Sequence, residues 1–164
     1  MLTDEHILCA YVDGSDIHDV APLLRIQLDG FIAGRRWATD QVVLEAGLGI
    51  IAYCESGQAQ LVSSPALEFE AGRNPHPIRK AHALSILGRV PLAVGLSPDV
   101  EQRARVFVQA GLKPLDALHF SCAAEAGADY FCTCDDRLLK RARAAHTGMP
   151  KVVSPLELVA ELGL

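Results

Sequence analysis

The 164-residue sequence lacks several features that would assign it to a class at once. It has no apolar run of the roughly 20 residues that a membrane-spanning helix needs. Its five cysteines show neither disulfide-like pairing nor zinc-ligand spacing. This argues against a small domain held together by disulfides and against one held together by zinc. No signal peptide, internal repeat, low-complexity stretch or interdomain linker is evident. We therefore expect a soluble, cytoplasmic protein with a single domain over residues 1–164.

Positive charge is also scarce. Lys and Arg number 15 against 20 Asp and Glu, which gives a net charge of −5. This balance lowers the expectation of a nucleic-acid partner, because phosphate binding depends on Lys and Arg. Four cations nevertheless cluster in one short stretch, and this cluster fits a solvated helix face equally well. Its members are Arg137, Lys140, Arg141 and Arg143.

Half of the residues are hydrophobic, and they fall into short apolar segments that alternate with helical patterns. This alternation predicts an α/β fold, a three-layer α/β/α sandwich with helices on both faces of a central, mainly parallel sheet. Residues 20–35 read as irregular to helical. Strands are expected at 7–12, 60–63, 91–94, 128–132 and 152–153, and helices over about 40–56, 65–72, 76–88, 98–111, 114–126, 137–143 and 155–162.

Two carboxylates flank one helix–strand unit within residues 113–141. Asp116 follows Pro114, which suits the first turn of a helix, and Asp135 follows the next predicted strand. Each could simply stabilise the start of its own helix. In a parallel α/β sheet, however, the strand ends face a crevice where ligands bind. The two acids therefore predict a divalent-metal site, with Asp136 as a secondary or capping acid.

Two more acids are candidates for the same site. Asp13 follows the apolar run 7–12, and Asp16 could share or replace its role. Glu68 and Glu70 lie in the helix after the second strand, about 200° apart around its axis. Only one of them can face a site, and spacing alone does not choose between them.

The chain resembles the PIN domains, small α/β/α metal-dependent nucleases that include the toxins of VapBC-type toxin–antitoxin pairs. The segments Pro114–His119 and Thr133–Leu139 resemble the C-terminal half of that family, Leu61–Pro75 resembles its second strand and helix, and Tyr11–Asp13 resembles its first acid. The resemblance implies a Mg²⁺- or Mn²⁺-dependent endoribonuclease that hydrolyses RNA phosphodiester bonds, with homodimers and a cognate antitoxin as expected partners. The catalytic and metal-binding residues that it implies are Asp13, Glu70, Asp116 and Asp135.

The sequence departs from the family pattern near the first acid, where Gly14 follows Asp13 and Asp16 takes an apolar position. This departure favours an alternative, a catalytically weak PIN-fold module that binds RNA or protein. A haloacid-dehalogenase-like phosphatase is a third reading, but Asp13-Gly14-Ser15 lacks the second Asp of that motif. We interpret His119 as a satisfied core or surface histidine outside the site. Ser15 and Thr133 could hydrogen-bond the metal ligands.

Overall fold

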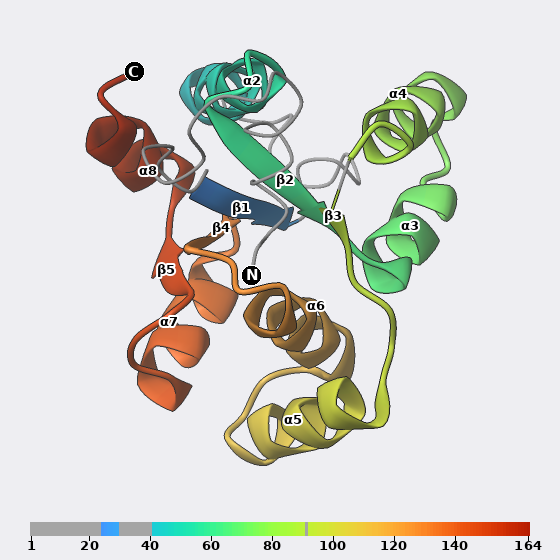
Figure 1. Cartoon of the computed structure of the whole chain (residues 1–164), viewed down its shortest axis with the longest axis vertical. Helices are drawn as coiled ribbons and strands as arrows, with labels where there is room; N and C mark the ends of the chain where they lie inside the picture. Colours follow the sequence, from blue (N-terminus) through green and yellow to red (C-terminus); the bar gives the residue numbers. More distant parts are fainter. Residues whose placement is uncertain (1–23, 30–40, 91) are drawn as a thin grey trace, which may run out of the picture.

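The computed structural model describes residues 24–29, 41–90 and 92–164. In this part of the chain, five strands form one sheet in the order β3-β2-β1-β4-β5, and every neighbouring pair is parallel (Figure 1). The predicted parallel sheet is confirmed. The strands are β1 (Leu24–Asp29), β2 (Ala59–Ser63), β3 (Leu92–Ala93), β4 (Tyr130–Thr133) and β5 (Lys151–Val153).

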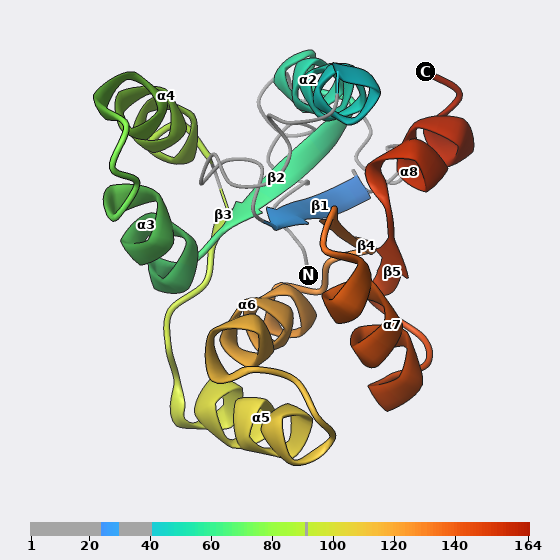
Figure 2. The same cartoon turned by 180° about the vertical axis from the view of Figure 1, so that it is seen from behind.

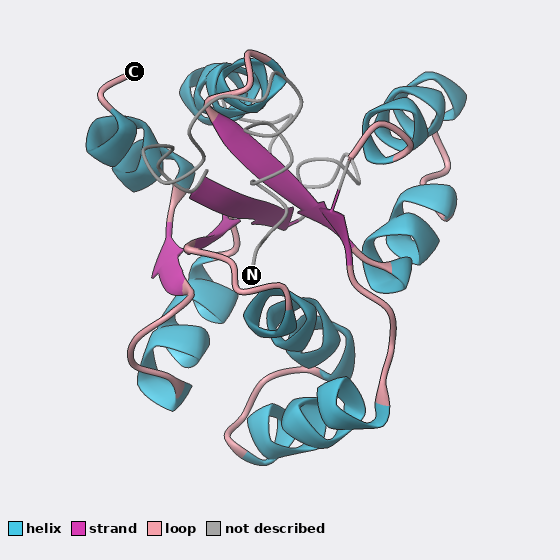
Figure 3. Ribbon diagram, viewed as in Figure 1, coloured by secondary structure: helices cyan, strands magenta, loops and turns pink. Residues whose placement is uncertain are grey.

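Helices cover both faces of this sheet, as Figures 2 and 3 show. Side chains of α2, α3, α4 and α8 form one buried cluster with the strands, and those of α5, α6 and α7 form a second. The layered α/β/α architecture expected from the sequence is therefore present. The helices are α2 (Gln41–Glu55), α3 (Pro65–Gly72), α4 (Pro77–Leu87), α5 (Pro98–Gln109), α6 (Pro114–Glu125), α7 (Asp136–Ala145) and α8 (Pro155–Leu162).

Serine followed by proline starts three of these helices. Ser64 and Ser97 each accept a hydrogen bond from the backbone N–H three residues on, at 3.2 Å, and Ser154 does the same for α8. Each proline takes the first helical position, where its missing N–H has no helical partner to lose. The helix starts predicted at these Ser-Pro pairs are confirmed.

The central strand was not foreseen. The prediction that residues 20–35 are irregular to helical is wrong for β1, which lies between β2 and β4. Ile26 and Leu28 are fully buried, as in an ordinary core strand, and so is the polar Gln27 between them. The strand predicted at residues 7–12 lies outside the described residues.

The carboxyl ends of β1 and β4 meet at one edge of the sheet. Asp29, the last residue of β1, is paired in the parallel register with Thr133, the last residue of β4. The chain continues from β1 to β2 on one side, whereas β4 lies on the other. This is a topological switch point, the place where open α/β sheets bind ligands.

Among the described residues, no helix combines the length and the apolar character that crossing a bilayer requires.

The capping of α8 generates a prediction on pH and stability. The Ser154 N–H donates to Glu157 Oε2 at 2.7 Å, and this bond, followed by the bonds from the Arg143 guanidinium, holds the pKa of Glu157 below its usual value. A depressed carboxylate pKa stabilises the fold above the unfolded-state pKa, and this contribution is lost as the pH falls through the folded-state pKa. Glu157→Gln should lower the free energy of unfolding at neutral pH by less than about 1 kcal/mol, because the pair is partly exposed.

Urea denaturation at neutral pH and at a pH well below the carboxylate range measures this effect. The difference between Glu157→Gln and the parent protein should disappear in acid. Glu68→Gln on α3, which alters an exposed side chain, should leave the free energy of unfolding unchanged at neutral pH. A Glu157→Gln difference that persists in acid would contradict the electrostatic explanation.

Candidate metal and phosphate site

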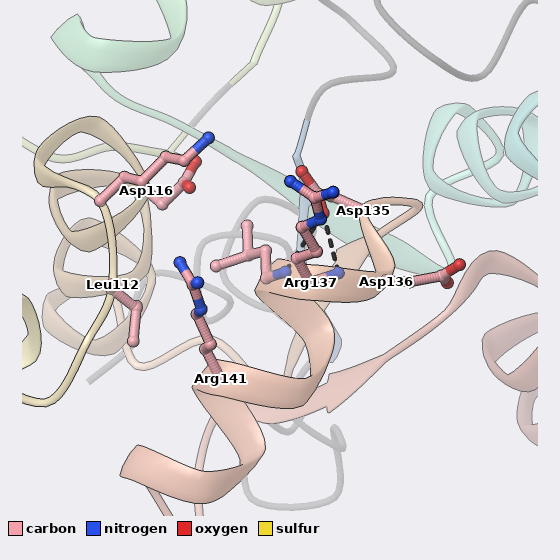
Figure 4. Close-up of a pocket in the computed structure, with 8 residues that line it drawn as sticks. Leu112, Asp116, Asp135, Asp136, Arg137 and Arg141 are labelled. Carbon is pink, nitrogen blue, oxygen red and sulfur yellow. Dashed lines mark hydrogen bonds between the residues drawn. The ribbon is translucent and has the colours of Figure 1, made fainter.

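A pocket of about 380 Å³ opens between the beginning of α6 and the beginning of α7. Figure 4 shows the residues of its wall, most of which are charged. We call it the α6–α7 pocket. Its lining residues are Leu112, Lys113, Asp116, Asp135, Asp136, Arg137, Leu138 and Arg141.

Asp135 is the N-cap of α7. Its Oδ1 accepts the backbone N–H groups of Arg137 and Leu138 at 2.9 and 3.2 Å, and its own N–H donates to Thr133 Oγ1 at 3.1 Å. The alternative interpretation of Asp135 as a capping residue is thus confirmed. Capping does not use every acceptor position of Asp135, because an ionised carboxylate has about four acceptor positions on two oxygens. The cap and the turn at buried Thr133 together fix the carboxylate beside the pocket.

Asp116 enters the pocket from the other helix. Pro114 occupies the first position of α6, and Asp116 lies in the first turn, half-buried. An acid in that turn also stabilises its helix through the helix dipole. Figure 4 shows Asp116 on the α6 side of the pocket and Asp135 on the α7 side. The structure therefore brings these two predicted site residues together, from elements separated by β4.

Asp136 differs from its neighbour although both line the same pocket. It is exposed, and in Figure 4 its side chain extends away from Asp116 and Asp135. It is also the acid in the first turn of α7, where negative charge is favourable. The structure thus supports the interpretation of Asp136 as a secondary acid.

Glu70 faces inward from α3 and is joined to α6. Its Oε2 lies 2.6 Å from His119 Nε2 in a hydrogen bond, with side-chain exposures of 9% for Glu70 and 0% for His119. Glu68 is exposed. Of these two acids of α3, it is therefore Glu70 that faces the protein interior, which residue spacing alone could not decide. His119 lies one turn beyond Asp116 on α6. Its backbone carbonyl accepts the amide of Gln27 in β1 at 2.8 Å.

The histidine was expected to have a hydrogen-bond partner outside the site, but the partner of its Nε2 is a predicted site acid. His119 thus links α3, α6 and the central strand β1 around Glu70. Glu70 is not among the described residues that line the α6–α7 pocket. No local sequence pattern signals this hydrogen bond, because its two residues are 49 positions apart.

The first acid of the site stays a prediction of the sequence. The described sheet has Asp29 at the carboxyl end of its central strand, whereas Asp13 and Ser15 lie outside the described residues. A signal for Asp29 was present in the sequence. Asp29-Gly30 follows a segment of alternating apolar and polar residues, as Asp13-Gly14 follows the apolar run 7–12, and Asp-Gly pairs commonly mark turns.

The donor set suits a hard divalent cation. Within the described residues, no group of three or more His, Cys, Asp or Glu side chains lies close enough to hold a metal ion. Mg²⁺ does not need such a group, since it usually keeps several waters and binds one or two carboxylates together with substrate phosphates. Asp116 and Asp135 supply two carboxylates to one polar pocket. The residues present therefore fit Mg²⁺ or Mn²⁺.

The hydrogen bond between Glu70 and His119 can be measured by a double-mutant cycle. Glu70→Ala, His119→Ala and the double variant should show a coupling free energy of about 1–3 kcal/mol, because the bond involves a carboxylate and is largely buried. Urea denaturation of the four proteins gives this value. Glu68→Ala combined with His119→Ala is the control and should be additive. Additivity in the Glu70 cycle as well would contradict the bond.

The comparison with protein families gives one match, the PIN domain, over residues 1–144. The comparison with curated proteins gives no match. PIN domains are typically metal-dependent nucleases that act on nucleic acid. The matched region includes the described sheet up to β4 and the α6–α7 pocket. This chain belongs to the PIN domain family.

Proposed function

We propose that the protein is a divalent-metal-dependent endoribonuclease that hydrolyses RNA phosphodiester bonds at the α6–α7 pocket. One observation carries this proposal: Asp116 and Asp135, from different helices, line a single pocket beside the carboxyl ends of β1 and β4. Acids that served only their own helices would have no need to share a pocket. Family membership supports the class of reaction.

The chemistry of the site follows from its charges. Two carboxylates in one pocket repel each other, and a bound cation offsets that repulsion. When bound, Mg²⁺ or Mn²⁺ would supply a water of lowered pKa and offset charge on the phosphodiester. Asp116 and Asp135 would hold the cation, and one of them would also orient the attacking water. The N-cap bonds of Asp135 keep its carboxylate in one orientation, which favours a reaction that depends on positioning.

The roles of the remaining acids stay open to test. Glu70 is bonded to buried His119 and is not among the described residues that line the α6–α7 pocket, so its role as a metal ligand stays a prediction of the family resemblance. For the first position we favour Asp29 over Asp13, because Asp29 ends the central strand at the level of Thr133. Asp13 stays a prediction of the sequence. A toxin role, a cognate antitoxin and a homodimer likewise stay predictions based on the family resemblance, and a cytoplasmic location stays a prediction based on composition.

A second function, a PIN-fold module that binds RNA or protein without efficient catalysis, has one observation in its favour. The described residues contain no group of three carboxylate, histidine or cysteine side chains at metal-binding distance. The two functions differ in one readout, since only the nuclease cleaves single-stranded RNA when Mn²⁺ is added.

Isosteric amides test the two pocket acids. Asp116→Asn and Asp135→Asn should each reduce Mn²⁺-dependent cleavage of single-stranded RNA by roughly 100-fold or more, because each loses a charged metal ligand. Asn caps helices as well as Asp does, so Asp135→Asn keeps the start of α7. Asp136→Asn is the matched control, and its activity should stay close to that of the parent.

Equal activity in all four proteins would reject the assignment of Asp116 and Asp135. Absence of Mn²⁺-dependent cleavage in the parent protein would favour the binding module instead. Circular dichroism of each variant establishes that the fold is retained.

A separate pair of variants tests the first acid. Asp29→Asn should lower the rate of Mn²⁺-dependent RNA cleavage to a similar extent as Asp116→Asn, whereas Asp13→Asn should retain activity. The physical reason is position, because Asp29 ends the strand that pairs with β4 next to Asp135. The opposite pattern would return the first-acid role to Asp13.

A further inference from the structure

Two arginines of α7 share the α6–α7 pocket with the acids. Arg137 and Arg141 both line it, and Figure 4 shows their side chains extending from α7 toward the space that Asp116 and Asp135 border. Residues four apart lie on the same face of a helix. Leu138 and Ala142, each next in sequence to one of these arginines, are the buried residues of α7. They fix the helix against the core, and both arginines line the pocket from it.

Neither guanidinium is engaged by another part of the described protein. Arg137 and Arg141 form no ion pair with any carboxylate in the described ranges, although two acids line the same pocket. Arg143, on the same helix, is bound by both carboxylate oxygens of Glu157, at 2.8 and 2.9 Å, and by the Val152 carbonyl. Other arginines also have carboxylate partners: Arg89 with Glu55, Arg103 with Glu125, and Arg105 with Glu101.

We infer that Arg137 and Arg141 bind backbone phosphates of a single-stranded RNA beside the bond that is cleaved. This inference rests on the proposed function and deepens it by assigning residues that hold the substrate. A guanidinium presents a planar set of donors that matches two phosphate oxygens. The arginines also supply positive charge where it is needed, because a polyanion approaching Asp116 and Asp135 is otherwise repelled.

The inference divides the basic cluster of the sequence into two parts. Arg137 and Arg141 line the pocket and bind phosphate, whereas Arg143 braces α7 against α8 through Glu157. Lys140 is exposed and is not among the described residues lining the pocket. It belongs to the solvated face of the helix. The same helix thus provides a matched control for the experiment.

The experiment measures binding apart from cleavage. Fluorescence anisotropy of a labelled single-stranded RNA is recorded in EDTA over a series of salt concentrations. Arg137→Gln and Arg141→Gln should each weaken binding roughly fivefold. Each should also reduce the slope of log affinity against log salt by roughly 0.7, the value for one lost phosphate contact on a single strand. Lys140→Gln, which removes the same charge from the same helix, should weaken binding less than about twofold.

Lysine replacements separate charge from geometry. Arg137→Lys and Arg141→Lys should keep the salt slope of the parent protein, because the charge remains, while losing part of the affinity that paired donors give. Both arginines are exposed, so the fold should be retained. Equal effects of Lys140→Gln and the two arginine variants would overturn the inference, as would a parent protein that does not bind RNA in EDTA.

The outcomes also separate this inference from the proposed function. Arginine-dependent binding without Mn²⁺-dependent cleavage would support phosphate binding and reject catalysis. Mn²⁺-dependent cleavage with unchanged affinity and KM in Arg137→Gln and Arg141→Gln would support the nuclease and overturn the role of the arginines.

Discussion

The parallel pairing of β1 with β4 is the constraint on which the rest of the structure depends. Because both strands run in the same direction, they end at the same edge of the sheet, with Asp29 beside Thr133. The segment after β4 then starts α7 with Asp135 as its cap. The chain that precedes β4 must return along α6, so α6 begins near the same edge. One geometric rule thus brings separate acids to one side of the protein.

Local stability and the proposed chemistry use the same side chains. Asp135 satisfies two backbone N–H groups that would otherwise lack partners at the start of α7, and Asp116 lies where the α6 dipole favours negative charge. These acids stabilise the starts of their helices even without a bound cation. This stabilisation offsets the repulsion between two like charges in one pocket. Glu70 is accommodated differently, because a nearly buried carboxylate requires a hydrogen-bond partner. Fully buried His119 provides it.

The sequence predicted the C-terminal half of the fold well because its signals there are local. Pro114 and the Ser-Pro pairs start helices by rules that involve only neighbouring residues. The glycine at 127, which adopts φ +66°, ends α6 by the same kind of rule. These rules were sufficient to place Asp116 and Asp135 near the ends that face the pocket.

The central strand could not be predicted in the same way. Its residues alternate between apolar and polar from Leu24 to Asp29, the pattern of a half-buried strand, but the polar Gln27 is fully buried as well, and its side-chain amide donates to the His119 carbonyl of α6. A partner 92 positions away leaves no trace in a local pattern, whereas the more apolar run at 7–12 gave a stronger signal. Residue spacing alone left Glu68 and Glu70 open for a similar reason, since the packing of α3 against α6 decides which of them faces inward.

The net charge of a chain does not predict its binding partners when positive and negative side chains lie in different parts of its surface. The excess of acids suggested that nucleic acid was a less favoured partner, but several arginines outside the pocket are paired with glutamates. These pairs cancel locally and add little to the field at the pocket. An approaching anion meets the charged residues that line the pocket, which are the cations Lys113, Arg137 and Arg141 and the acids Asp116, Asp135 and Asp136. A divalent cation held by Asp116 and Asp135 would offset their charge and leave the pocket with a net positive charge. The acidity of the whole chain is therefore compatible with a pocket that attracts phosphate.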